Sequence, residues 1–168
     1  EEIITNAKGC DGLLCLLTDK IDAEVMDKTG VKAIANYAVG YDNIDINAAN
    51  ERKIPVTNTP GVLTEATADL TWALILAVSR RVVEADKFMR EGKFRGWEPM
   101  LFLGGDFYGK TLGIIGFGRI GQAVARRAQG FGMKVLYYSR TRKPELEKEL
   151  GVEYASLHDL ISQSDYVS

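Results

Sequence analysis

The sequence is poor in the residue types that build metal centres, disulfide frameworks and membrane spans. Its 168 residues include two cysteines and one histidine, which argues against a zinc site held by those ligands. No apolar run is long enough to cross a bilayer. Lysine and arginine total 21 against 23 for aspartate and glutamate, a net charge of −2. Nothing in this balance points to a nucleic-acid or membrane partner.

The two cysteines, Cys10 and Cys15, lie close together around an apparent strand. We expect two buried, reduced thiols and no disulfide, as is usual for a cytoplasmic protein. The chain opens on Glu1 without Met, and a buried strand is predicted to start at Tyr166 and Val167, where the chain ends. We therefore expect a piece of a longer protein.

Apolar runs alternate with stretches of helical periodicity, the pattern of α/β units around a parallel sheet. Strands are predicted at residues 12–17, 31–38, 54–58, 111–115, 135–139 and 152–155. The first of them is continuously apolar, and we expect it to be buried on both faces.

One long helix is predicted from Thr64, its N-cap, to the neighbourhood of Gly92. Its middle is apolar on nearly every side, so it must be covered on both sides. Residues 92–108, "GKFRGWEPMLFLGGDFY", are irregular and aromatic, and are predicted to form a packed linker. The domain boundary is expected here, which gives domains at residues 1–92 and 93–168.

A glycine fingerprint follows the strand predicted at 111–115. "TLGIIGFGRIGQAVARRAQGFG" contains Gly116, Gly118 and Gly121 in the spacing G-x-G-x-x-G. The first glycine permits a tight turn, the second lets a pyrophosphate approach the backbone, and the third lets the helix pack on the sheet. The free N–H groups at the helix start would hold the phosphates. The alternative is a glycine-rich turn with no ligand.

A basic turn follows the next strand, where an NAD site would place an acidic residue. "KVLYYSRTRK" offers Ser139, Arg140, Thr141 and Arg142 in that position. A carboxylate there accepts hydrogen bonds from the ribose 2′-hydroxyl of NAD, whereas guanidinium groups bind phosphate bidentately. We infer a site that prefers NADP(H), with NAD(H) also possible. The alternative is a solvated basic turn, Lys143 most of all.

Three segments, "NYAVGYDNID", "NTPGVLTEATADLTWALIL" and "GKTLGIIGFGRIGQAVARRAQGFGMKVLYYSRT", together resemble the D-isomer-specific 2-hydroxyacid dehydrogenases. The "YYSRTRKPE" stretch is most similar to the glyoxylate/hydroxypyruvate reductase branch. The resemblance implies an α/β chain, with a flavodoxin-like substrate domain segment followed by the first half of a Rossmann-type, doubly wound nucleotide-binding domain. It also implies reduction of a small 2-oxo acid, and a homodimer. The apolar long helix, Trp97 and Phe102 favour the same dimer.

The resemblance implies that the backbone amides of Val39 and Gly40 bind the substrate carboxylate. Two N–H groups in a glycine loop form an anion cradle without a charged side chain. From the residues alone, a plain strand-to-helix loop is an equal alternative. Asp42 and Asp45 are expected to be turn and cap residues.

The resemblance also assigns cofactor contacts. Thr67 is similar to the family threonine near the nicotinamide, although its residue type alone indicates an ordinary first-turn position. Phe117, Gly118, Arg119 and Ile120 resemble the phosphate loop, and Arg119 could instead be a solvated side chain at the helix start.

The family's catalytic Arg, Glu and His are expected downstream of residue 168, so the resemblance implies no turnover by this chain alone. His158 does not match the family's histidine and is expected on a helix surface. Two alternatives stay open: a dinucleotide-sensing interaction module like the family's co-repressors, and an NAD-using phosphoglycerate dehydrogenase.

Overall fold

The structure is a computed structural model that describes residues 1–168. The chain forms two compact units, Glu1–Leu63 and Thr64–Ser168. This division falls before the long helical segment, whereas the sequence placed its domain boundary after it. The difference arises because Ala68 and Trp72, from the start of that segment, are buried in the core of the second unit. The functional assignment of the two parts stays a prediction.

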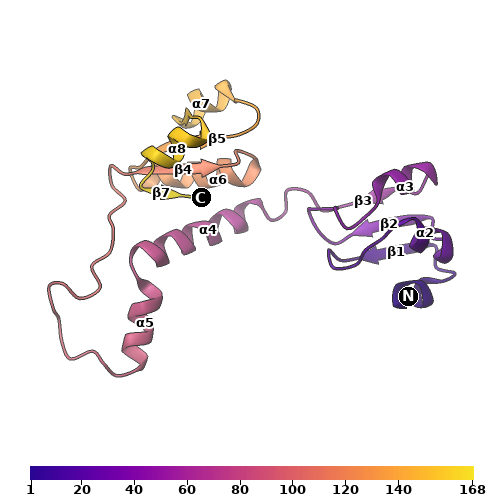
Figure 1. Ribbon diagram of the computed structural model, residues 1–168, viewed down its shortest axis with the longest axis horizontal. Helices are drawn as coiled ribbons and strands as arrows, with labels where there is room; N and C mark the ends of the chain where they lie inside the picture. The colour runs from indigo at the N-terminus through magenta and orange to yellow at the C-terminus, as the bar shows by residue number, and fades with distance from the viewer. The chain divides into compact units, whose positions relative to one another are not determined.

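The first unit is a three-stranded parallel sheet with three short helices. In chain order its elements are α1 (Glu2–Ala7), β1 (Gly12–Cys15), α2 (Ala23–Thr29), β2 (Ala33–Asn36), α3 (Ile46–Glu51) and β3 (Val56–Thr57). The strands lie in the order β1-β2-β3 (Figure 1). Asp22 and Asp45 cap α2 and α3, each accepting a hydrogen bond from a first-turn N–H. The cap predicted at Asp45 is confirmed.

The core of the first unit lies on one face of its sheet. Cys15 and Ile34 pack with side chains from all three helices. Because side chains alternate along a strand, Leu14 points to the opposite face and is 73% exposed. The prediction that this strand is buried on both faces is therefore wrong within the first unit. Cys10 is also exposed, contrary to expectation, while Cys15 is buried and both thiols are free.

The second unit is built around a four-stranded parallel sheet. Its elements are α4 (Thr64–Ser79), α5 (Val82–Arg90), β4 (Thr111–Ile115), α6 (Arg119–Gly130), β5 (Lys134–Tyr138), α7 (Pro144–Leu150), β6 (Glu153–Tyr154), α8 (Leu157–Gln163) and β7 (Tyr166–Val167). The strand order is β6-β5-β4-β7. The fingerprint strand β4 is therefore central, with β5 on one side and β7 on the other.

The long helix predicted from Thr64 to Gly92 is two helices. Arg81 takes a left-handed backbone conformation with φ 54°, and α5 starts after it. The N–H of Gly105, in the irregular segment, donates to the Ser79 carbonyl at 2.9 Å. That carbonyl is therefore bonded outside the helix. The Ser79 hydroxyl also bonds the Ile75 carbonyl at 2.8 Å, a contact that often bends helices.

Helix α4 is tied to α6 by a buried aromatic cluster and by ion pairs. Trp72 stacks on Phe131 at 4.4 Å, and its indole N–H donates to the Val124 carbonyl at 3.0 Å. On the surface, Arg127 bonds both Glu65 and Asp69. None of the chain's helices combines the length and apolar character that a membrane span requires.

Candidate functional site: a glycine loop facing a basic turn

The glycine loop joins β4 to α6 and has the geometry that the fingerprint predicts. Gly116 has φ +96°, a conformation that residues with a side chain rarely adopt. Its N–H donates to the Tyr138 carbonyl at 2.8 Å, which ties the loop to the end of β5. No side chain caps α6. The first N–H groups of this helix are therefore available to an anion.

Gly121 and Gly118 differ in the space that a side chain would have. A Cβ on Gly121 would collide with the Gly116 carbonyl oxygen, so this glycine is required by the close packing of α6 on the loop. A Cβ on Gly118 would meet no atom of the chain within 4 Å. The space above Gly118 is open, as expected where a ligand approaches the backbone.

A cavity of about 550 Å³ lies at the carboxyl ends of β4 and β5. Its lining comes from residues 115–118 of the glycine loop and from residues 138–141 and Lys143 of the basic turn. The sheet order reverses beside β4, and such a crevice is the usual ligand position in open α/β sheets. The structure thus brings Gly116, Phe117, Gly118, Ser139, Arg140 and Thr141 together around one cavity.

Two cations in this lining have no partner within the chain. Neither the Arg140 nor the Lys143 side chain makes an ion pair or hydrogen bond, and no carboxylate lines the cavity. The Ser139 hydroxyl donates to the Thr141 carbonyl at 2.7 Å and closes the turn. The sequence interpretation set Lys143 aside as solvated, so the structure adds it to the candidate site.

Arg142 lies outside the cavity lining, unlike its neighbours in the turn. Its guanidinium forms a two-point pair with Glu147 of α7, at 2.9 Å and 2.8 Å. This pair, together with a hydrogen bond from Tyr137, lowers the pKa of Glu147 to about 2. The Arg142 fork is therefore engaged by Glu147 within the chain, and its contact with a phosphate stays a prediction.

The remaining predicted cofactor residues have different positions in the second unit. Phe117 is buried and stacks on Tyr137 at 4.1 Å, so its side chain anchors the loop at the edge of the cavity. Arg119 and Ile120 are exposed at the start of α6. Thr67 lies in the first turns of α4 and is not part of the cavity lining.

The loop predicted to bind a carboxylate lies in the first unit, between β2 and α3. The Asn58 amide donates to the Val39 carbonyl at 2.8 Å, and the buried Asn36 amide donates to the Gly40 carbonyl at 2.7 Å. The N–H groups of Val39 and Gly40 donate no hydrogen bond within the chain. The two carbonyls are held while the two amides stay available, which fits an anion cradle.

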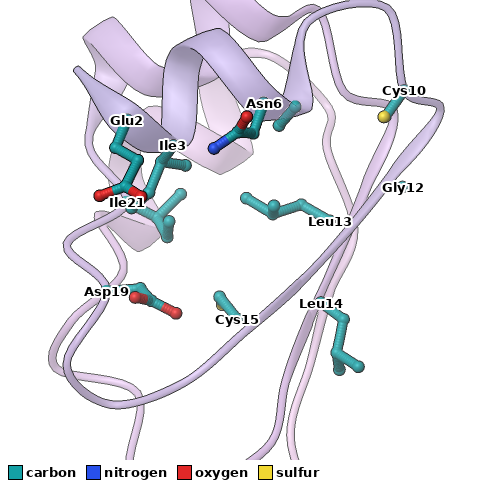
Figure 2. Close-up of a pocket in the computed structure, with 11 residues that line it drawn as sticks. Glu2, Ile3, Asn6, Cys10, Gly12, Leu13, Leu14, Cys15, Asp19 and Ile21 are labelled. Atoms are coloured by element: carbon teal, nitrogen blue, oxygen red, sulfur yellow. The ribbon is translucent and has the colours of Figure 1, made fainter.

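The first unit has a cavity of its own, about 520 Å³ in volume, and the loop that contains Val39 and Gly40 does not line it. Figure 2 shows it between α1 and β1, with Glu2, Asn6, Asp19 and Cys15 around it. Two carboxylates and no basic side chain line it, so it does not suit a carboxylate substrate. Burial, followed by the nearby Asp19 charge, raises the pKa of the Cys15 thiol.

The chain's single histidine is a surface residue. The His158 side chain is 91% exposed, which confirms the surface position expected for it. No group of three or more His, Cys, Asp or Glu side chains is placed to hold a metal ion. The groups that border the candidate site, backbone amides and cationic side chains, suit an anion.

Residues 72–168 match the family described as "D-isomer specific 2-hydroxyacid dehydrogenase, NAD binding domain". The chain belongs to this dehydrogenase family. Curated relatives include the glyoxylate reductases of Korarchaeum cryptofilum, 60% identical over 168 residues, and Thermococcus litoralis, 57% identical over 171 residues. Each alignment covers 99% of this chain but 51% and 52% of the respective relative. The chain spans about half the length of the curated relatives it matches.

Solved structures share the fold of this chain over nearly its whole length. The TT0316 protein of Thermus thermophilus is 53% identical with a TM-score of 0.93, covering 99% of this chain and 52% of that one. The D-lactate dehydrogenase of Aquifex aeolicus, solved with NAD and lactic acid, is 32% identical with a TM-score of 0.85, covering 98% and 49%. The family uses a nicotinamide dinucleotide, and the glycine loop fits its pyrophosphate.

Proposed function

We propose that this chain supplies the nucleotide-phosphate and substrate-carboxylate sites of an NADPH-preferring reductase of small 2-oxo acids. The observation that carries the proposal is the cavity of the second unit. There an uncapped helix start and an open glycine face two unpaired cations, with no carboxylate in the lining. Helix amides bind a diphosphate, and Arg140 and Lys143 suit the additional 2′-phosphate of NADP(H).

The roles of the chain's own residues follow from this assignment. The amides at the start of α6 orient the dinucleotide, and Thr67 on α4 is assigned to the nicotinamide end by its family resemblance. The amides of Val39 and Gly40 hold the carboxylate of the 2-oxo acid. Bound NADPH supplies the hydride that the carbonyl carbon accepts. Since the His158 side chain is exposed and lines neither site, we do not assign it as the proton donor.

The substrate class rests on the named relatives and on the carboxylate loop. Matches at 57% and 60% identity are glyoxylate reductases, and the free amides of the loop suit a carboxylate. We therefore assign glyoxylate or hydroxypyruvate as substrate. The full-length protein is expected to oxidise NADPH when either acid is added, with a lower KM for NADPH than for NADH. Nucleotide binding without turnover of either acid would contradict the enzymatic assignment.

We also propose that the full-length protein is a homodimer that uses an apolar stripe on α4. Leu70, Leu74 and Val78 recur every four residues, a spacing that places them on one helix face, and they are 58–79% exposed. Trp97 is also exposed, at 82%, whereas Phe102 packs against Phe88 within the unit. Contiguous exposed apolar side chains of this kind mark interfaces.

Replacement of Leu74 by glutamate is expected to convert the full-length dimer to monomer, because it places a charge in a desolvated contact. Light scattering after size-exclusion chromatography measures the mass. Lys87→Glu on α5, at a solvent-exposed position, serves as a charge-changing control and is expected to stay dimeric. A Leu74→Glu protein that remains dimeric would place the interface elsewhere.

A further inference from the structure

We propose that Glu147 and Tyr137 are positioning residues for nucleotide selectivity: together they hold the basic turn so that Arg140 and Lys143 face the cavity. This inference rests on the proposed function, because it assigns to two residues the control of the 2′-phosphate site. Neither residue lines the cavity, so both act through the turn.

The two residues make a continuous set of hydrogen bonds beneath the turn. The Tyr137 hydroxyl donates to Glu147 at 2.8 Å and accepts from the backbone N–H of Lys143 at 2.7 Å. Glu147 in turn holds the Arg142 guanidinium at two points. The Arg142 side chain is thereby fixed to α7, and the Lys143 backbone amide is fixed to Tyr137 of β5.

The fixed end determines which cations remain available. Arg142 is drawn toward α7 and lies over the Tyr154 ring at 5.7 Å. With Arg142 held, the basic side chains left to the cavity are Arg140 and Lys143. Tyr137 holds the backbone N–H of Lys143. The same network therefore also fixes the position from which the Lys143 side chain extends.

The network also reaches the glycine loop. Tyr137 is fully buried, and its ring stacks on Phe117, which lies between the two glycines that border the cavity. The pyrophosphate loop and the basic turn therefore share one buried aromatic support. Since buried, fully satisfied networks specify one arrangement, the two sides of the cavity are set relative to each other.

The test compares Glu147→Gln and Tyr137→Phe with wild type in the full-length protein, using glyoxylate and either NADPH or NADH. Each variant is expected to raise the KM for NADPH by roughly five- to tenfold, because each removes hydrogen bonds that hold the turn. The KM for NADH and the kcat with either nucleotide are expected to stay within about twofold. Tyr137→Phe keeps the net charge, and so separates loss of position from a change in charge.

Glu149→Gln is the matched control for charge. It removes the same charge from the same helix, but Glu149 is exposed and contacts nothing in the turn. It is expected to leave both KM values unchanged. A double Glu147→Gln, Tyr137→Phe protein is expected to show less than the product of the two single effects, because both act on one turn.

Three results would overturn the inference while leaving the proposed function intact. One is a Glu147→Gln protein with a lower KM for NADPH, which would mean that released Arg142 binds the phosphate better than the held turn does. Another is an unchanged KM for NADPH in both variants. The third is an equal rise for NADPH and NADH, which would indicate general loosening. A wild-type protein that uses NADH but not NADPH would overturn this inference together with the nucleotide preference proposed above.

Discussion

Replacement of Gly118 by valine is expected to abolish nucleotide binding by the full-length protein while leaving it folded. The Cβ of this residue meets no atom of the chain within 4 Å, and its φ of −80° suits any residue. The valine side chain would instead occupy the space in which a pyrophosphate approaches the backbone. We expect the Kd for both NADPH and NADH to rise by roughly 100-fold or more, since diphosphate contacts to helix amides are charge-assisted.

Isothermal titration calorimetry measures the affinity, and a thermal melt without nucleotide reports on the fold. Gly130→Ala is the control, because Gly130 lies on the same helix with equally open surroundings. It is expected to bind both nucleotides normally. Unchanged affinity in the Gly118→Val protein would mean that the dinucleotide binds away from this loop, and the proposed function would fail with it.

The second large effect is expected from Arg140→Asp. This change removes an unpaired guanidinium from the cavity lining. It introduces a carboxylate at the position where NAD sites use one to bind the ribose 2′-hydroxyl. The kcat/KM for NADPH is expected to fall by roughly 100-fold, through lost charge-assisted bonds and new repulsion. The kcat/KM for NADH is expected to hold or rise, so the nucleotide preference reverses.

The matched control for this change is Arg119→Asp, in which an exposed arginine at the start of α6 is altered beside the pyrophosphate site. Because both nucleotides carry the pyrophosphate, this variant is expected to weaken NADPH and NADH alike and to leave their ratio unchanged. If Arg140→Asp leaves the ratio of NADPH to NADH rates unchanged as well, the basic turn does not select the nucleotide.

Sequence patterns located the elements around the glycine loop well, because local signals agree there. The strand predicted at residues 111–115 has these bounds in the structure, and the cap predicted at Asp45 of the first unit is present. Each depends on neighbours within a few positions. The break after Ser79 could not be predicted in this way, because its carbonyl bonds a glycine 26 residues further along the chain.

The candidate site was predictable in its position and only partly in its members. The order of an apolar strand, a glycine fingerprint, a second strand and a basic turn predicted two loops that face each other. Which of the basic side chains enter the cavity depends on a partner: Glu147, five residues after Arg142, holds that guanidinium away. The one-sided burial of β1 likewise depends on where the helices pack, since an apolar strand looks the same whether one face or two are covered.

The two thiols of the first unit differ in exposure, which has a practical consequence. Thiol-directed reagents react with the thiolate, and the Cys15 group is buried, hydrogen-bonded to Asn36 at 3.3 Å and raised in pKa. Cys10 is exposed. In the folded chain Cys10 is therefore the one thiol that a maleimide can reach, and a dye attached there reports on the first unit.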